Sequence, residues 1–165
     1  MTGTTSSTTN STTNSTDQAQ GAGDYAAVKT FRSSPDSVLA ALRTTDAISA
    51  WWGPASGSAA EGGRFRADFG EGRHHDIVVV AQEPGRVEWR SAGAPHHHGE
   101  WEGTTMVFEF AATGEGTEMS FRHAGLTPRL ECYGNCSAGW TQVLASLVDY
   151  VDTGEGHPYR ADATN

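Results

Sequence analysis

The residues best suited to chemistry lie between positions 121 and 140, where a histidine, two cysteines and a tryptophan recur at short spacings. His123 alternates with Met119 and Phe121, so it shares their face of a predicted strand. An imidazole there can hydrogen-bond a ligand or transfer protons, or it can form a structural hydrogen bond near the next helix. We favour the structural role and keep His123 as the candidate acid or base.

Cys132 and Cys136 are four residues apart, so they are neighbours on one face of a predicted helix. A thiolate near a helix N-terminus is stabilised by the helix dipole, which is consistent with a redox pair or a nucleophile. Metal binding together with His123 is a further alternative, although C-x-x-x-C is not the usual zinc spacing. Buried cysteine also packs as a small hydrophobic side chain, and we favour that role.

Five further histidines are expected to be solvated, with adventitious metal binding as the alternative for the run at 96–98. His96, His97 and His98 follow one another in a loop with Gly and Pro, where consecutive side chains diverge. His74 and His75 flank a predicted turn and are expected at the surface. Phosphate-binding loops, the G-x-S-x-G nucleophile motif and H-E-x-x-H are absent from the sequence.

These residues are positioned by a predicted α+β fold. The expected elements are a strand at 25–32, a short helix capped by Ser34, a second at 45–50, strands at 64–69, 76–82, 87–90, 102–112 and 118–123, and a helix at 131–153. The last helix carries one continuous apolar face. A curved antiparallel sheet with that helix across one face buries both apolar surfaces.

The composition of the chain predicts where the folded domain begins and ends. Residues 1–23 are almost entirely small and polar, so we expect a disordered tail without a secretory signal. One domain is expected at 24–160, followed by a short tail at 161–165. The net charge of −9 argues against nucleic acid, and no apolar run is long enough for a membrane span. Two cysteines indicate no disulfide framework, so the expected compartment is the cytoplasm.

Three motifs carry a family resemblance. W-W-G at 51–53, W-E-G-T-T-M-V-F-E-F at 101–110 and H-A-G-L-T-P-x-x-E-C-Y-x-x-C-x-x-x-W at 123–140 resemble the SRPBCC (START/Bet v 1-like) superfamily. The most similar branch is the bacterial relatives of the activator of Hsp90 ATPase homologue. The resemblance implies a helix-grip fold with a cavity between helix and sheet, which in the superfamily holds apolar or amphipathic small molecules and in some members is an active site.

We therefore expect a binding protein for an apolar or amphipathic small molecule, without cofactor or metal. A stress-related role and homodimers are further hypotheses. The alternatives are a cofactor-independent cyclase- or hydrolase-type enzyme using His123, a partner-binding module like a chaperone activator, and a thiol sensor using Cys132 and Cys136. Aromatic side chains commonly line such cavities. The predicted lining residues are Trp51, Trp52, Phe65, Trp89, Phe108, Met119, Phe121, His123, Cys136, Trp140 and Leu144.

Overall fold

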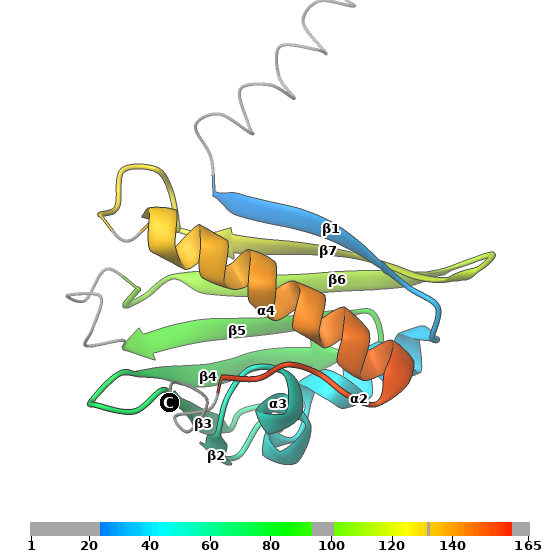
Figure 1. Ribbon diagram of the computed structural model, residues 1–165, viewed down its shortest axis with the longest axis horizontal. Coiled ribbons are helices and arrows are strands. Elements are labelled where there is room, and N and C mark those ends of the chain that lie inside the picture. Colours follow the sequence, from blue (N-terminus) through cyan, green and yellow to red (C-terminus); the bar gives the residue numbers. More distant parts are fainter. Residues whose placement is uncertain (1–23, 94–100, 132, 160–165) are drawn as a thin grey trace, which may run out of the picture.

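The computed structural model describes residues 24–93, 101–131 and 133–159. The elements in chain order are β1 (Tyr25–Phe31), α2 (Pro35–Leu42), α3 (Thr45–Trp51), β2 (Ala55–Gly57), β3 (Arg64–Asp68), β4 (His74–Glu83), β5 (Arg86–Gly93), β6 (Thr105–Thr113), β7 (Gly116–Ala124) and α4 (Tyr133–Thr153). Figure 1 shows α4 crossing one face of the sheet, with α2 and α3 near its C-terminal end. The predicted tails, the histidine run at 96–98 and Cys132 lie outside the described residues.

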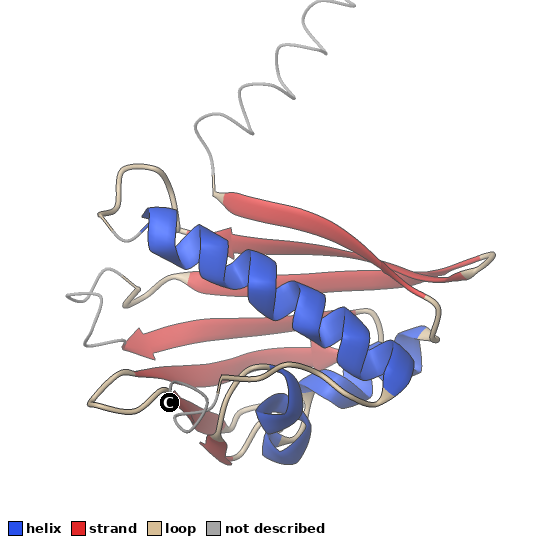
Figure 2. Ribbon diagram, in the orientation of Figure 1, coloured by secondary structure: helices blue, strands red, loops and turns tan. Residues whose placement is uncertain are grey.

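The seven described strands form one antiparallel sheet in the order β1-β7-β6-β5-β4-β3-β2. Their side chains alternate between the two faces: in β7, Met119, Phe121 and His123 are buried and the residues between them are exposed. β1 pairs with β7, and Tyr25 lies opposite His123. The helices cover the face that carries the buried residues (Figure 2), which confirms the predicted helix-grip α+β fold.

The structure differs from the prediction at several boundaries. β2 was not predicted, because three residues are too few for alternation to be recognised. The strand expected from residue 102 begins at Thr105, since Gly103 has a φ of 82° and belongs to a turn. The long helix begins at Tyr133 instead of residue 131. None of these shifts changes which face of the sheet or of α4 is buried.

The short helices begin where the sequence predicts. The Ser34 hydroxyl accepts a hydrogen bond from a backbone N–H of the first turn of α2, and Pro35 occupies the first helical position. Thr44 caps α3 in the same way, at 3.1 Å. α3 continues to Trp51, one residue beyond its predicted end, so Trp51 is buried in the core and Trp52 follows directly at the helix end.

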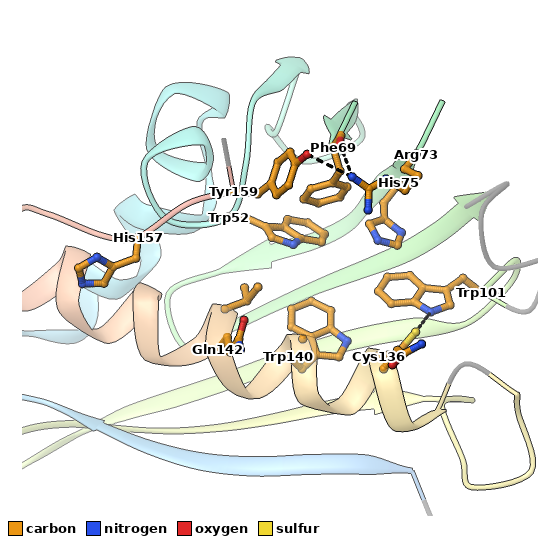
Figure 3. A pocket seen from close by; sticks show the side chains of 13 residues that line it. Trp52, Phe69, Arg73, His75, Trp101, Cys136, Trp140, Gln142, His157 and Tyr159 are labelled. Atoms are coloured by element: carbon orange, nitrogen blue, oxygen red, sulfur yellow. Dashed lines mark hydrogen bonds between the residues drawn. The ribbon is translucent and has the colours of Figure 1, made fainter. Parts of the chain in front are cut away.

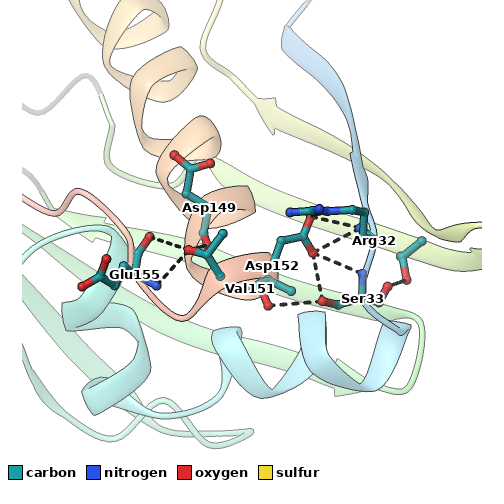
Figure 4. Close-up of polar contacts among 8 residues, drawn as sticks. Arg32, Ser33, Asp149, Val151, Asp152 and Glu155 are labelled. Atoms are coloured by element: carbon teal, nitrogen blue, oxygen red, sulfur yellow. Dashed lines mark hydrogen bonds and ion pairs between the residues drawn. The ribbon is translucent and has the colours of Figure 1, made fainter.

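The carboxylate of Asp152 ties the end of α4 to the connection between β1 and α2. It accepts hydrogen bonds from the backbone N–H groups of Arg32 (3.0 Å) and Ser33 (3.1 Å) and from the Ser33 hydroxyl (2.9 Å) (Figure 4). Burial alone would raise the pKa of this carboxyl group, but the donated hydrogen bonds outweigh burial and hold the Asp152 pKa below its ordinary value.

Asp152→Asn is therefore expected to lower the free energy of unfolding at pH 7 by about 1.5–3 kcal/mol, the range for hydrogen bonds to a charged group. Because the folded-state pKa is depressed, the wild-type contribution is complete above the unfolded-state pKa of about 3.9. It is lost as the pH falls through the folded-state pKa. Urea unfolding at several pH values should show the difference between wild type and variant shrinking in acid.

Asp149→Asn is the matched control, because it removes the same charge from the same end of α4. The ion pair of Asp149 with His157 is exposed on both sides, so its loss should cost less than about 1 kcal/mol. If the two variants were equally destabilised, or if the Asp152→Asn difference grew in acid, the prediction would be contradicted. The hydrogen bonds to the Asp152 carboxylate would then contribute less to the free energy of unfolding than expected.

Candidate functional site

A pocket opens between α4, the turn that joins β3 to β4, and the segment after α4. Its volume is about 320 Å³. Ligand pockets in proteins range from about 300 to 1,000 Å³, so this one suits a small molecule. Figure 3 shows the side chains around it. The lining residues are Trp52, Phe69, Arg73, His75, Trp101, Asn135, Cys136, Gly139, Trp140, Gln142, Val143, His157 and Tyr159.

Four of these rings, which we call the aromatic wall, are stacked with similar orientations: Trp52, His75, Trp101 and Trp140. Successive rings in that order are inclined by 17°, 23° and 10°, with centroids 5.7, 4.0 and 6.0 Å apart. Offset stacking of this kind is favourable beyond the area it buries. These four residues are only 2–6% exposed, so a small part of each ring borders the pocket and gives it an apolar, aromatic lining.

His75 reaches the aromatic wall because β4 begins earlier than its apolar run indicates. The strand starts at His74, and alternation with Ile77 and Val79 turns His75 inward. The expectation that His75 lies at the surface is therefore wrong. His74 points the other way, is partly exposed and lies 3.6 Å from the carboxylate of Asp76.

α4 contributes to the pocket through a single face. Cys136, Gly139, Trp140 and Val143 follow one another at spacings of three and four residues, which places them side by side on a helix. Gly139 leaves that face open, since a Cβ atom built there would meet no atom within 4 Å beyond its own helix backbone. At Gly139 the pocket therefore borders the backbone of α4, beside the side chains of Cys136 and Trp140.

His123 is fully buried and does not line the pocket. The indole N–H of Trp140 donates to its Nδ1 at 2.9 Å, and its Nε2 lies 2.7 Å from the Thr104 hydroxyl. An indole N–H can only donate, so Nδ1 carries no proton and Nε2–H donates to Thr104. The Thr104 hydroxyl in turn donates to the carbonyl of Trp101 at 2.6 Å. His123 is a neutral link in a structural hydrogen-bond chain.

The thiol of Cys136 is also engaged. Its Sγ accepts a hydrogen bond from the indole N–H of Trp101 at 3.2 Å, which joins α4 to the turn before β6. Within the part of the chain that the structure describes, no group of three or more His, Cys, Asp or Glu residues is arranged to hold a metal ion. The two-cysteine hypotheses stay predictions, because Cys132 is not among the described residues.

Arg73 and Tyr159 form a polar edge of the pocket. Nη2 of Arg73 donates to the Tyr159 hydroxyl at 3.1 Å and to the carbonyl of Phe69 at 2.9 Å. The backbone N–H of Tyr159 donates to the carbonyl of Trp52 at 2.9 Å. The sequence did not predict these residues, because one follows a glycine turn and the other follows the stop of α4, where no periodicity applies.

The predicted cavity residues separate into two groups. Trp52, Cys136 and Trp140 line the pocket. The others lie in the hydrophobic core or beside it: Trp51, Phe65, Trp89, Phe108, Met119, Phe121, His123 and Leu144. Alternation identifies all inward-facing side chains, but only a few of them border the pocket.

The comparisons with known proteins agree with this architecture. The family model described as "Activator of Hsp90 ATPase homolog 1-like protein" matches residues 32–152. The solution structure of the Aha1 dimer from Colwellia psychrerythraea is 26% identical, with a TM-score of 0.69 over 81% of this chain and 98% of that chain. No curated protein matches this sequence.

Among the described residues, no helix combines the length and apolar character needed to cross a membrane.

Two further solved structures share the fold at lower identity. Protein MLL2253 from Mesorhizobium loti is 22% identical, with a TM-score of 0.66 over 75% of this chain and 93% of that chain. CalU16 from Micromonospora echinospora is 19% identical, with a TM-score of 0.63 over 80% of this chain and 75% of that chain.

Proposed function

Because this chain belongs to the family of Activator of Hsp90 ATPase homolog 1-like proteins, within the SRPBCC superfamily, we propose that it binds a small, largely apolar molecule in the pocket beside α4. The aromatic wall carries the proposal, because its four rings line a pocket of about 320 Å³. The two cysteines indicate no disulfide framework, so the proposal places this binding in the cytoplasm.

Binding is a better account of the pocket than acid–base catalysis by His123. His123 was the candidate acid or base, and both of its ring nitrogens are used by Trp140 and Thr104. A general base needs a free nitrogen within hydrogen-bond reach of the substrate, and His123 does not line the pocket. The indole N–H groups of Trp101 and Trp140 are likewise engaged, so these two side chains can contact a ligand only by stacking and apolar contact.

Gly139→Leu is expected to abolish binding, because the new side chain would project into the pocket from a position where nothing lies within 4 Å. Native mass spectrometry of protein purified from its own host without stripping should show a bound small molecule in the wild type and none in the variant. Gly134→Leu is the matched control: it is also a helical glycine with open space around it, but it does not line the pocket.

The proposal fails if the wild type carries no molecule and its tryptophan fluorescence does not change across a panel of aromatic compounds and lipids. It also fails if Gly139→Leu and Gly134→Leu retain the ligand equally, because the molecule would then be bound elsewhere.

The proposal also includes self-association as a homodimer. It is supported by the dimeric solution structure from Colwellia psychrerythraea. The match covers 98% of that chain and 81% of this one. Sedimentation equilibrium should give twice the mass of one chain at micromolar concentration. A single-chain mass across the concentration range would contradict this part of the proposal.

A further inference from the structure

The net charge of the described residues that line the pocket is opposite in sign to the net charge of the chain. The chain has a formal net charge of −9, with 20 acidic and 11 basic residues. Yet none of the described residues that line the pocket is an aspartate or a glutamate, and Arg73 contributes a full positive charge. His157 also lines the pocket, but its ring lies 3.2 Å from the carboxylate of Asp149, which balances any charge it carries.

Arg73 is also held without a carboxylate partner among the described residues. Its Nη2 is anchored by the carbonyl of Phe69 and the hydroxyl of Tyr159, and its guanidinium carbon lies 5.6 Å from the centre of the Tyr159 ring. These contacts fix the guanidinium by neutral groups, and no carboxylate of a described residue compensates its charge. Other arginines differ: Arg66, for example, is paired with Asp76 at 2.6 Å.

Two hydrogen-bond donors remain at this edge of the pocket. Nη1 of Arg73 makes no hydrogen bond to a described residue, and the Tyr159 hydroxyl, which accepts from Nη2, keeps its own proton to donate. Figure 3 places both side chains together on the side of the pocket away from α4. A carboxylate has two oxygens and can accept one hydrogen bond from each donor.

The rest of the pocket selects for a flat apolar body. Neighbouring rings of the aromatic wall are inclined by 10° to 30°, so they give the pocket a roughly flat apolar border that suits a planar molecule. An apolar protein cavity of about 150 Å³ holds one benzene ring. The volume of about 320 Å³ is therefore enough for about two rings.

We propose that the pocket binds planar aromatic carboxylates of about two rings, with the rings against the aromatic wall and the carboxylate on Arg73 and Tyr159. This inference rests on the proposed function and specifies the ligand class. The probes that test it are 2-naphthoate, its neutral amide 2-naphthamide and the cationic 2-naphthylmethylammonium, titrated by isothermal calorimetry at pH 7. We expect 2-naphthoate to bind at least tenfold more tightly than the amide and the cation to bind most weakly.

Substitutions separate charge recognition from packing. Arg73→Gln should remove the preference for 2-naphthoate over the amide, and Arg73→Lys should keep part of it, because an ammonium retains the charge but not the planar fork. Tyr159→Phe should weaken 2-naphthoate several-fold and leave the amide unchanged. Arg90→Gln is the matched control: it makes the same change of charge at an exposed position that alternates away from buried Trp89 on β5. A melting curve of each variant checks that the fold is intact.

The outcomes are distinguishable from failure of the proposed function. Equal affinities for 2-naphthoate and 2-naphthamide, both lost in Gly139→Leu, would overturn the anion preference and leave the pocket as a binding site. Equal losses in Arg73→Gln and Arg90→Gln would also overturn it, because net charge alone would then explain the effect. If no probe binds while native mass spectrometry shows a molecule that Gly139→Leu removes, the ligand class is wrong and the proposed function stands.

Discussion

His123→Leu is expected to lower the free energy of unfolding by about 2–5 kcal/mol. The substitution leaves the indole N–H of Trp140 without its acceptor, and the hydroxyl of Thr104 without its donor, in a site where His123 is fully buried. Each buried polar group left unsatisfied costs about 1–3 kcal/mol. Urea unfolding followed by tryptophan fluorescence measures the difference directly.

Two variants make this result specific. His123→Gln retains an acceptor for Trp140 and a donor for Thr104, so it should recover part of the loss. Met119→Leu changes another buried residue on the same face of β7 without touching a hydrogen bond, and it should cost less than about 1.5 kcal/mol. If His123→Leu were as stable as Met119→Leu, the hydrogen-bond chain would be unimportant and an acid–base role for His123 would regain support.

Gly156→Ala should have the largest effect on the edge of the pocket. A Cβ at this position would lie 2.6 Å from the carbonyl oxygen of Ala50 and 3.0 Å from the Ser146 hydroxyl. The backbone of the segment after α4 has to move away. It would then lose the hydrogen bond from His157 N–H to Ser146 and displace Tyr159 from the pocket.

We expect Gly156→Ala to lower stability by about 1–3 kcal/mol and the affinity for a pocket ligand at least tenfold. Hydrogen exchange should show faster exchange at the amides of His157 and Tyr159 than in the wild type. Gly134→Ala is the control, since a Cβ there meets nothing within 4 Å and alanine favours the helix. Unchanged protection of both amides in Gly156→Ala would contradict the prediction.

Periodicity predicted those parts of the fold that have a buried face. The alternation of Met119, Phe121 and His123 and the stripe from Cys136 to Leu147 correspond directly to buried side chains in β7 and α4. Since a sheet face and a helix face of this length have to cover each other, the architecture followed from the sequence. β2 escaped prediction because it is only three residues long.

The pocket was harder to predict because it depends on residues that are distant in the chain. Trp52 and Trp140 were predicted as aromatic lining, and they line the pocket. Arg73 comes from a turn and Tyr159 from the segment after α4, and only the folded chain brings their side chains to 3.1 Å. His75 could have been found by extending the alternation of Ile77 and Val79 back by one step.

The pairing of β1 with β7 has a consequence for how the chain folds as it is made. Tyr25 in β1 lies opposite His123 in β7, so the partner of β1 is among the last segments of the sheet to be synthesised. The ribosome adds about 5–20 residues per second. The hydrogen-bonding groups of β1 that pair with β7 therefore stay without these partners for several seconds after β1 has been made. Such non-local pairing slows folding, and until β7 is made the nascent β1 has an unpaired edge on which another chain can pair.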